Sequence, residues 1–373
     1  MSRFLEERIP EYIRGIPAYV PGKPVEEVER ELKIHAIKLA SNENPLGPSP
    51  LALEAARNAL ARSNRYPDGG SKVLREALAA RHGVSSGEIF IGLGSSEIID
   101  LAARALLRPG LAGLTSHGTF ALYPIAIRAS GAALLEVPQR NYGFDLPAMA
   151  AAIREETRVI YLANPNNPTG TAFGAAELDE FLRRVPRDVL VVLDEAYIEY
   201  AERMDFPRSL ELFRERDNLV ILRTFSKVHG LAGLRIGYGI ARAGLVHEWN
   251  KLRTPFNTSA VAQAAALAAL DDAEHVRRSV EITRAGRGQL IAGLGRMGLH
   301  PVASETNFVF VELGPHAKQI AGELLRHGVI VRPLGWTGFP DAIRISVGAP
   351  EENDTFLAAM GQVWPAHSAV RQA

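Results

Sequence analysis

Residues 219–237 have the sequence LVILRTFSKVHGLAGLRIG, a short apolar run followed by a polar turn. The run LVIL predicts a buried strand, because short apolar stretches bounded by turn residues are typical of strands covered on both faces. Lys227 lies in the turn with Thr224 and Ser226, and Arg235 comes eight residues later. A lysine amine forms an imine with an aldehyde, while hydroxyl and guanidinium groups bind phosphate. The stretch therefore indicates either a covalent site for a phosphorylated carbonyl compound or a solvated surface loop.

Six further apolar runs of similar length occur between residues 88 and 240, with helical patterns between most of them. Alternating strands and helices are typical of βαβ units, so we predict an α/β large domain with a mostly parallel seven-stranded sheet flanked by helices. The expected strands are residues 88–91, 111–115, 133–137, 159–163, 189–193, 219–222 and 236–240.

The C-terminal part of the chain has a different pattern, in which a long helix expected over residues 273–294 is followed by three strand candidates. This pattern predicts a smaller α+β domain that also packs with N-terminal residues. We therefore expect a large domain at residues 45–275 and a small domain formed by residues 1–44 plus 276–373. The three strand candidates lie within residues 301–313, 328–335 and 342–348.

The composition excludes several classes of protein. The chain has 373 residues, 47% of them hydrophobic, but no apolar run of the roughly 18 residues that a membrane span needs. The 42 basic and 42 acidic residues form no block that favours nucleic acid or an anionic membrane. Without cysteine there are no disulfides, thiolate metal sites or cysteine nucleophiles, and we expect no metal ion. The N-terminus, MSRFLEERIPEY, lacks the apolar core of a signal peptide, so we expect a cytoplasmic protein.

Two other segments carry polar groups directly after an expected strand. Gly94, Ser95 and Ser96 in GLGSSE open a helical pattern, where free backbone N–H groups and the helix dipole favour an anion. Ordinary helix capping by Ser95 or Ser96 is the alternative. The segment ANPNNPTG places side-chain amides after another expected strand, where they can hydrogen-bond an oxygen of a ligand ring, although a simple turn also explains its prolines and glycine.

Asp194 ends the most apolar of the expected strands, in VLVVLDEAYIEY, and Tyr197 follows three residues later. A buried carboxylate needs a partner, because an unpaired buried charge is costly. The partner is either an arginine in a structural ion pair or a protonated pyridine nitrogen, which the aspartate would keep cationic. Together these segments provide an imine-forming lysine, a phosphate site, a pyridinium partner and amide or phenol donors. Those groups are the ones that recognise pyridoxal 5'-phosphate (PLP).

The segments SNENP, RYPDG, GLGSSE, GTFALYP, NPNNPTG, DEAYIEY, RTFSK…GLRIG and SETNF…AIRISVG occur in this order across residues 41–347. On these segments the chain resembles the fold type I PLP-dependent aminotransferases of class II, and more narrowly their histidinol-phosphate aminotransferase branch. The resemblance implies a homodimer that transfers the amino group of L-histidinol phosphate to 2-oxoglutarate in histidine biosynthesis.

The resemblance also implies roles for individual residues toward the cofactor. Lys227 would bind the cofactor aldehyde and move the substrate proton, and Asp194 would pair with the pyridinium nitrogen. Asn167 and Tyr197 would contact the ring oxygen, and Tyr66 in RYPDG would reach a phosphate across the dimer interface. The other implied contacts are phosphate binding by Gly94, Ser95, Ser96, Thr224, Ser226 and Arg235, and stacking of Phe120 on the ring.

For the substrate, the resemblance implies that Arg344 in AIRISVG binds the carboxylate or phosphate and that Arg332 in VIVRP assists with the phosphate ester. A structural ion pair is the alternative for Arg332. Tyr19 and Asn42 match substrate-side positions, and Asn307 is a further candidate. Aromatic amino acid transamination is the nearest alternative activity, followed by decarboxylation of a phosphorylated amino acid and by a PLP-binding regulator without turnover. A nicotinamide dehydrogenase is disfavoured, because no GxGxxG follows the first sheet strand.

Overall fold

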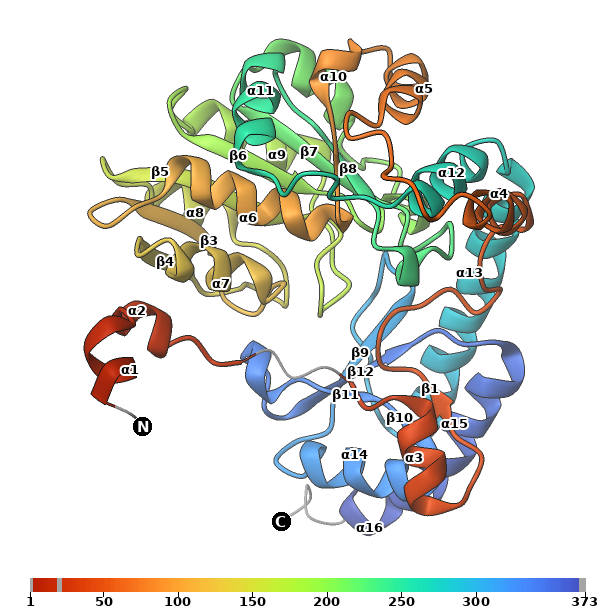
Figure 1. The fold of residues 1–373 in the computed structure, drawn as a ribbon. Helices are drawn as coiled ribbons and strands as arrows, with labels where there is room; N and C mark the ends of the chain where they lie inside the picture. The colour runs from red at the N-terminus through yellow and green to blue at the C-terminus, as the bar shows by residue number, and fades with distance from the viewer. Residues whose placement is uncertain (1–2, 19–21, 369–373) are drawn as a thin grey trace.

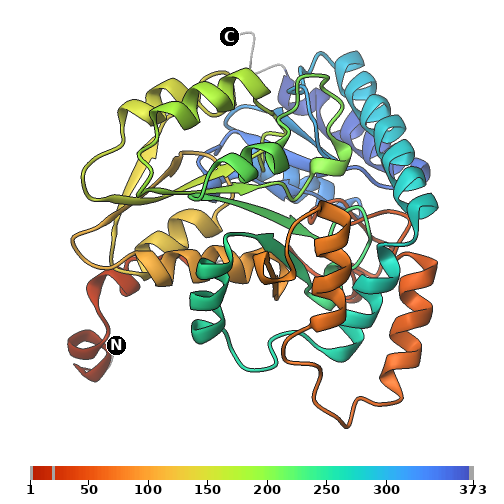
Figure 2. The same cartoon turned by 90° about the horizontal axis from the view of Figure 1, so that it is seen from above.

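The computed structural model describes residues 3–18 and 22–368, and it has the α/β architecture that the sequence predicts. A seven-stranded sheet has the strand order β2-β8-β7-β6-β5-β3-β4, and all of its strands except β8 run in the same direction. Helices cover both faces of this sheet (Figure 1, Figure 2). Its strands are β2 (Ile89–Gly92), β3 (Ala112–Ser116), β4 (Ala133–Val137), β5 (Thr157–Ala163), β6 (Leu190–Asp194), β7 (Leu219–Thr224) and β8 (Gly237–Ile240).

Strand β6 shows why the sequence predicts the strands of this sheet to within two residues at each end. Leu190 and Val192 belong to one apolar cluster, whereas Val191 and Leu193 belong to the cluster on the opposite face. Burial on both faces makes such a strand a continuous apolar run. The helices on the first face are α6 (Gly94–Leu106), α7 (Leu122–Ala129) and α11 (Ala243–Leu252). Those that contribute to the cluster on the second face are α4 (Pro50–Leu60), α5 (Lys72–His82), α8 (Leu146–Ala151), α9 (Ala175–Arg184), α10 (Ser209–Glu215) and α12 (Ala260–Ala269).

The C-terminal unit contains an antiparallel sheet in the order β11-β12-β9. The prediction of one strand within residues 328–335 is wrong, because the structure has two short strands there, separated by Val331. The first of them, β10, pairs with the N-terminal strand β1, whereas the second, β11, pairs with β12. The two strands therefore belong to different sheets. The strands are β1 (Ile37–Lys38), β9 (Phe308–Glu312), β10 (Val329–Ile330), β11 (Arg332–Pro333) and β12 (Ala342–Ser346), and the helices around them are α3 (Val25–Leu32), α13 (Ala273–Arg296), α14 (Ala317–Arg326), α15 (Pro350–Val363) and α16 (Pro365–Ser368).

The N-terminal helices α1 (Arg3–Arg8) and α2 (Glu11–Arg14) lie apart from the C-terminal unit (Figure 1). Helix α2 contacts α7, where the ring of Tyr12 lies beside Gly131. The pairing of β1 with β10 nevertheless joins residues 37–38 to the C-terminal unit. Within residues 3–18 and 22–368, none of the helices combines the length and the apolar character that crossing a membrane requires.

Candidate active site

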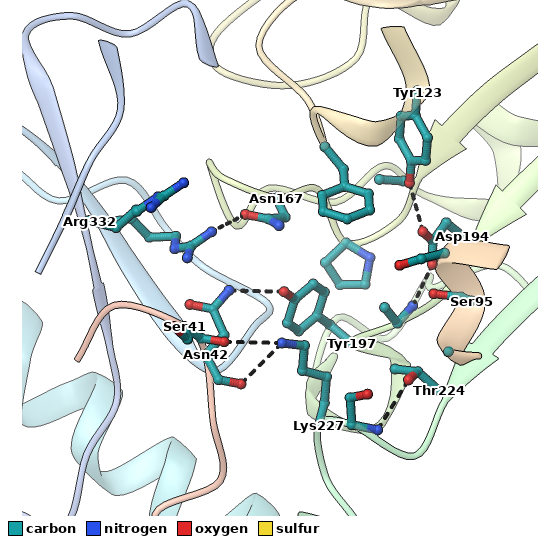
Figure 3. Close-up of a pocket in the computed structure, with 18 of the residues that line it drawn as sticks. Ser41, Asn42, Ser95, Tyr123, Asn167, Asp194, Tyr197, Thr224, Lys227 and Arg332 are labelled. Carbon is teal, nitrogen blue, oxygen red and sulfur yellow. Dashed lines mark hydrogen bonds between the residues drawn. The ribbon is translucent and has the colours of Figure 1, made fainter. Parts of the chain in front are cut away.

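A cavity of about 200 Å³ lies at the carboxyl edge of the large sheet, facing the sheet that contains β11 and β12 (Figure 3). Strands β2, β5, β6 and β7 all end at this edge, so the four segments that the sequence singles out do meet there. The predicted residues that line the cavity are Asn42, Gly94, Ser95, Ser96, Phe120, Asn167, Asp194, Tyr197, Thr224, Ser226, Lys227, Arg235, Arg332 and Arg344.

Lys227 follows β7, and its amine points toward the segment that contains Ser41 and Asn42 (Figure 3). Nζ donates hydrogen bonds to the carbonyl oxygens of both residues, each at 3.3 Å. Burial, followed by the positive charge of Arg344, lowers the pKa of Lys227 from 10.5 to about 7. Near neutral pH a large share of this amine is therefore unprotonated, which is the form that attacks a carbonyl carbon. Ser41 is not among the predicted residues, because it contacts Lys227 through its backbone carbonyl, and the type of a residue does not reveal such a contact.

Asp194 is the last residue of β6, and only 5% of its surface is exposed. Its Oδ2 accepts a hydrogen bond from the hydroxyl of Tyr123 at 2.8 Å, and its Oδ1 accepts one from the backbone amide of Ala196 at 3.1 Å. Burial raises the pKa of Asp194 to about 6, and these two hydrogen bonds oppose the increase. Tyr123 is not among the predicted residues, although it is the third residue after Phe120 in GTFALYP. Tyr123 therefore orients the carboxylate of Asp194 and belongs to the same GTFALYP segment as Phe120.

Asp194 and Glu195 are adjacent, but they have different partners because successive side chains at a strand end point to opposite faces of the sheet. Asp194 lies on the side of α7, where Tyr123 is buried. Glu195 accepts hydrogen bonds from Nε and Nη2 of Arg223 at 3.0 and 2.9 Å. The interpretation as a structural ion pair with arginine therefore applies to Glu195 and is wrong for Asp194.

The amino end of α6 forms another wall of the cavity. The cap position is Leu93, which makes no side-chain capping bond, so the alternative of capping by one of the two serines is wrong. Gly94 adopts φ +70°, and a Cβ there would lie 2.8 Å from Nη2 of Arg235. A Cβ on Gly237 would lie 2.7 Å from the backbone nitrogen of Ser95. These glycines let the guanidinium and the first backbone amides of the helix converge, which produces a site suited to phosphate.

The two residues predicted to contact a ring oxygen are both held by residues from the opposite wall. Nδ2 of Asn42 donates a hydrogen bond to the hydroxyl of Tyr197 at 2.9 Å, and the backbone N–H of Asn42 donates to Oγ of Ser346 at 2.8 Å. Nη1 of Arg344 donates to Oδ1 of Asn167. Within the Asn167 side chain, the amide nitrogen is therefore the atom that can donate to a ligand.

Arg332 and Arg344 occupy directly opposite positions on the antiparallel strands β11 and β12. Both side chains are buried and both line the cavity. Cζ of Arg344 lies 5.2 Å from the ring centre of Phe308, and Cζ of Arg332 lies 4.7 Å from that of Trp336. Like charges directly opposite each other destabilise a sheet, so this arrangement suits a site whose ligand brings negative charge.

Three other predicted residues lie elsewhere. Asn307 is buried next to the cavity, where its Nδ2 donates to the backbone oxygen of Asn42 at 3.0 Å, so it supports the site from behind. Tyr66 does not line this cavity; its side chain is 82% exposed and stacks on Phe256. Tyr19 falls outside the described residues.

The chain belongs to the protein family described as aminotransferase class I and II, which it matches over residues 34–360. Histidinol-phosphate aminotransferase 2 of Pseudomonas fluorescens strain Pf-5 is 51% identical to it over 354 residues, which cover 94% of this chain and 96% of that relative. Histidinol-phosphate aminotransferase 1 of Nitrosococcus oceani is 46% identical over 94% of this chain and 95% of that relative.

A solved structure supports the same family. The histidinol-phosphate aminotransferase from Sinorhizobium meliloti in complex with pyridoxal-5'-phosphate aligns with a TM-score of 0.89 at 32% identity, covering 96% of this chain and 98% of that chain. The predicted fold class and the family resemblance are therefore confirmed.

Proposed function

We propose that this chain is a PLP-dependent histidinol-phosphate aminotransferase, which transfers the amino group of L-histidinol phosphate to 2-oxoglutarate in histidine biosynthesis. The names of its relatives support the activity, and the S. meliloti complex supports the cofactor. One structural observation carries the substrate assignment, namely that the opposed Arg332 and Arg344 line the same cavity as Lys227. A paired guanidinium site can bind the phosphate ester of the donor and the carboxylates of the acceptor in turn.

The residues of the cavity fit this cofactor on three counts. Because Gly94 has no Cβ, the guanidinium of Arg235 can approach the amino end of α6, and this arrangement suits the phosphate. The buried carboxylate of Asp194 suits the ring nitrogen, and the amine of Lys227 suits the aldehyde. When bound, PLP supplies an electron sink for the charge that remains when a proton leaves the substrate. The other residues that would hold it are Ser95, Ser96, Phe120, Asn167, Tyr197, Thr224 and Ser226.

The residues of this chain then have distinct tasks during amino-group transfer. Nζ of Lys227 takes the proton from the substrate carbon that bears the amine, because burial and nearby arginines keep a share of it unprotonated near neutral pH. Asp194 keeps the ring nitrogen of the cofactor protonated, while Tyr123 fixes the direction of that carboxylate. Arg344 orients the anionic end of either substrate. The two substrates use these residues in succession, as in a ping-pong reaction.

We further propose a homodimer in which Tyr66 of each subunit serves the cavity of the other. Tyr66 is 82% exposed, and its ring centre lies 4.6 Å from that of Phe256, which is 46% exposed. Exposed apolar side chains often mark protein interfaces. Three more such side chains belong to α4 (Pro50–Leu60), and they are Leu51, Leu53 and Leu60.

A hybrid dimer tests the shared site. Lys227→Ala and Tyr66→Phe subunits are each expected to be impaired alone, but a mixed dimer contains one cavity with both residues intact. Recovery of activity on mixing supports the proposal, whereas sedimentation at the single-chain mass of 40.5 kDa contradicts it.

The cytoplasmic location and the domain division at residues 45–275 remain proposals as well.

The substrate assignment is tested with purified enzyme, 2-oxoglutarate and alternative amino donors. We expect kcat/KM for L-histidinol phosphate to exceed that for phenylalanine, because only the former places a phosphate between the two arginines. A clear preference for phenylalanine contradicts this proposal and favours an aromatic aminotransferase. Release of CO2 from a phosphorylated amino acid without an oxo-acid acceptor contradicts transamination itself.

A further inference from the structure

Trp336 is an aromatic residue beside the active site to which the proposed function gives no role. It lies between β11 and β12, within the short 3-10 helix Gly335–Thr337, and its ring centre is 4.7 Å from Cζ of Arg332. Trp336 also lines a smaller cavity that adjoins the first, together with Phe120, Asn167 and both arginines. Its side chain is 43% exposed, so it stands at the rim of the site.

The contact between Trp336 and Arg332 has a clear physical purpose. Arg332 and Arg344 stand directly opposite each other, and their mutual repulsion favours turning one guanidinium away from the cavity. The face of an indole attracts a guanidinium and also stacks on it. Trp336 is therefore placed to keep Arg332 directed at the cavity before any anion arrives, which reduces the cost of ordering the side chain upon binding.

The loop that carries Trp336 is itself fixed by two contacts with the segment that follows β3. The imidazole of His117 occupies the space that a Cβ on Gly338 would need, and the ring of Phe339 lies 2.6 Å from where a Cβ on Gly118 would be. His117 and Gly118 directly follow β3 and lead toward the segment with Phe120. The contacts between the loop and this segment hold the indole in a defined place.

We propose that Trp336 is a positioning residue that determines specificity for a phosphorylated amino donor by holding Arg332 in its binding orientation. The inference rests on the proposed function and deepens it. It predicts that the indole matters for donors that carry a phosphate ester and much less for donors that use Arg344 alone.

The test is a set of variants assayed as PLP-loaded enzyme with histidinol phosphate and with phenylalanine. Trp336→Leu is expected to lower the ratio of the two kcat/KM values about 5- to 30-fold, the range for a partly desolvated cation–π contact, mainly through KM for histidinol phosphate. Trp336→Phe keeps an aromatic face and should lower the ratio by about threefold or less. In an Arg332→Ala background, Trp336→Leu should change the ratio no further, because the two residues act as one unit.

Inorganic phosphate gives a readout that does not depend on turnover of the phosphorylated donor. Its inhibition constant against glutamate should rise in Trp336→Leu and return toward the wild-type value in Trp336→Phe. Equal losses for both donors, additive effects in the Arg332→Ala background, or an unchanged phosphate inhibition constant each overturn the inference. A wild-type preference for phenylalanine instead overturns the proposed function, and phosphate inhibition still tests Trp336 in that case.

Discussion

Replacing Asp194 with asparagine is expected to lower activity but, without cofactor, to raise stability. The carboxylate is 5% exposed, and burial raises its pKa from 3.8 to about 6. Since one pKa unit corresponds to about 1.4 kcal/mol, ionisation of this group destabilises the folded chain by about 3 kcal/mol. The pKa of the folded state lies above that of the unfolded state, so this penalty is absent below pH 3.8 and complete above about pH 6.

Asparagine removes the charge, but it offers one acceptor oxygen where the carboxylate offers two. If that oxygen accepts from the backbone amide of Ala196, Nδ2 faces the hydroxyl of Tyr123, whose proton then loses its acceptor. Leaving one buried donor unsatisfied costs about 1 to 2 kcal/mol, so a net gain of about 1 to 2 kcal/mol remains at pH 8. With PLP bound we expect the balance to reverse, because in the proposed site the carboxylate would face a cationic ring. Removing one partner of a buried ion pair costs about 3 to 5 kcal/mol, so we expect kcat to fall about 100- to 5,000-fold.

Steady-state kinetics at pH 8 and thermal unfolding of the cofactor-free chain at pH 5 and pH 8 measure both effects. The gain in melting temperature should shrink at pH 5, where the wild-type carboxylate is largely protonated. Glu195→Gln is a matched control, because this adjacent buried carboxylate pairs with Arg223 and its loss should lower the melting temperature. If Asp194→Asn keeps more than about a tenth of kcat, the carboxylate does not have the proposed role toward the ring nitrogen. If the cofactor-free variant melts below the wild type at pH 8, the buried charge does not destabilise the folded chain.

Three further predictions follow from the same geometry. Lys227→Ala should abolish the visible absorption band that PLP gives with the wild type, and a persisting band would identify another lysine as the attachment site. Because the pKa of Lys227 is lowered to about 7, the rate of PLP capture by the cofactor-free enzyme should rise with pH up to about 7 and then level off; a rate that is constant from pH 5 to pH 8 contradicts this. Gly94→Ala should weaken PLP binding at least about tenfold, since the new Cβ would meet Arg235. A Cβ on Gly233, within the short 3-10 helix Ala232–Leu234, would meet open space, so Gly233→Ala should bind PLP normally. Equal effects of both changes in an equilibrium titration would remove Arg235 from the phosphate site.

The sequence could predict the large sheet because its strands are buried on both faces and are therefore continuous apolar runs. It could also predict the residues whose side-chain chemistry is distinctive, such as Lys227 and Asp194. Tyr123 was not predictable in the same way, because a buried tyrosine on a helix looks like an ordinary core residue until its hydroxyl is seen to meet a carboxylate. The split between β10 and β11 depends on pairing with strands elsewhere in the chain, which local residue patterns do not encode.

The distribution of the site between two sheets has a consequence for how this enzyme can diverge. The residues of this cavity that we assign to the cofactor follow strands of the seven-stranded sheet, whereas both arginines stand on the short hairpin of β11 and β12. Exchange of that hairpin can therefore alter which amine is accepted, provided that Arg344 is kept, because its positive charge also lowers the pKa of Lys227. New donors are accessible by grafting about fifteen residues rather than by rebuilding the catalytic centre.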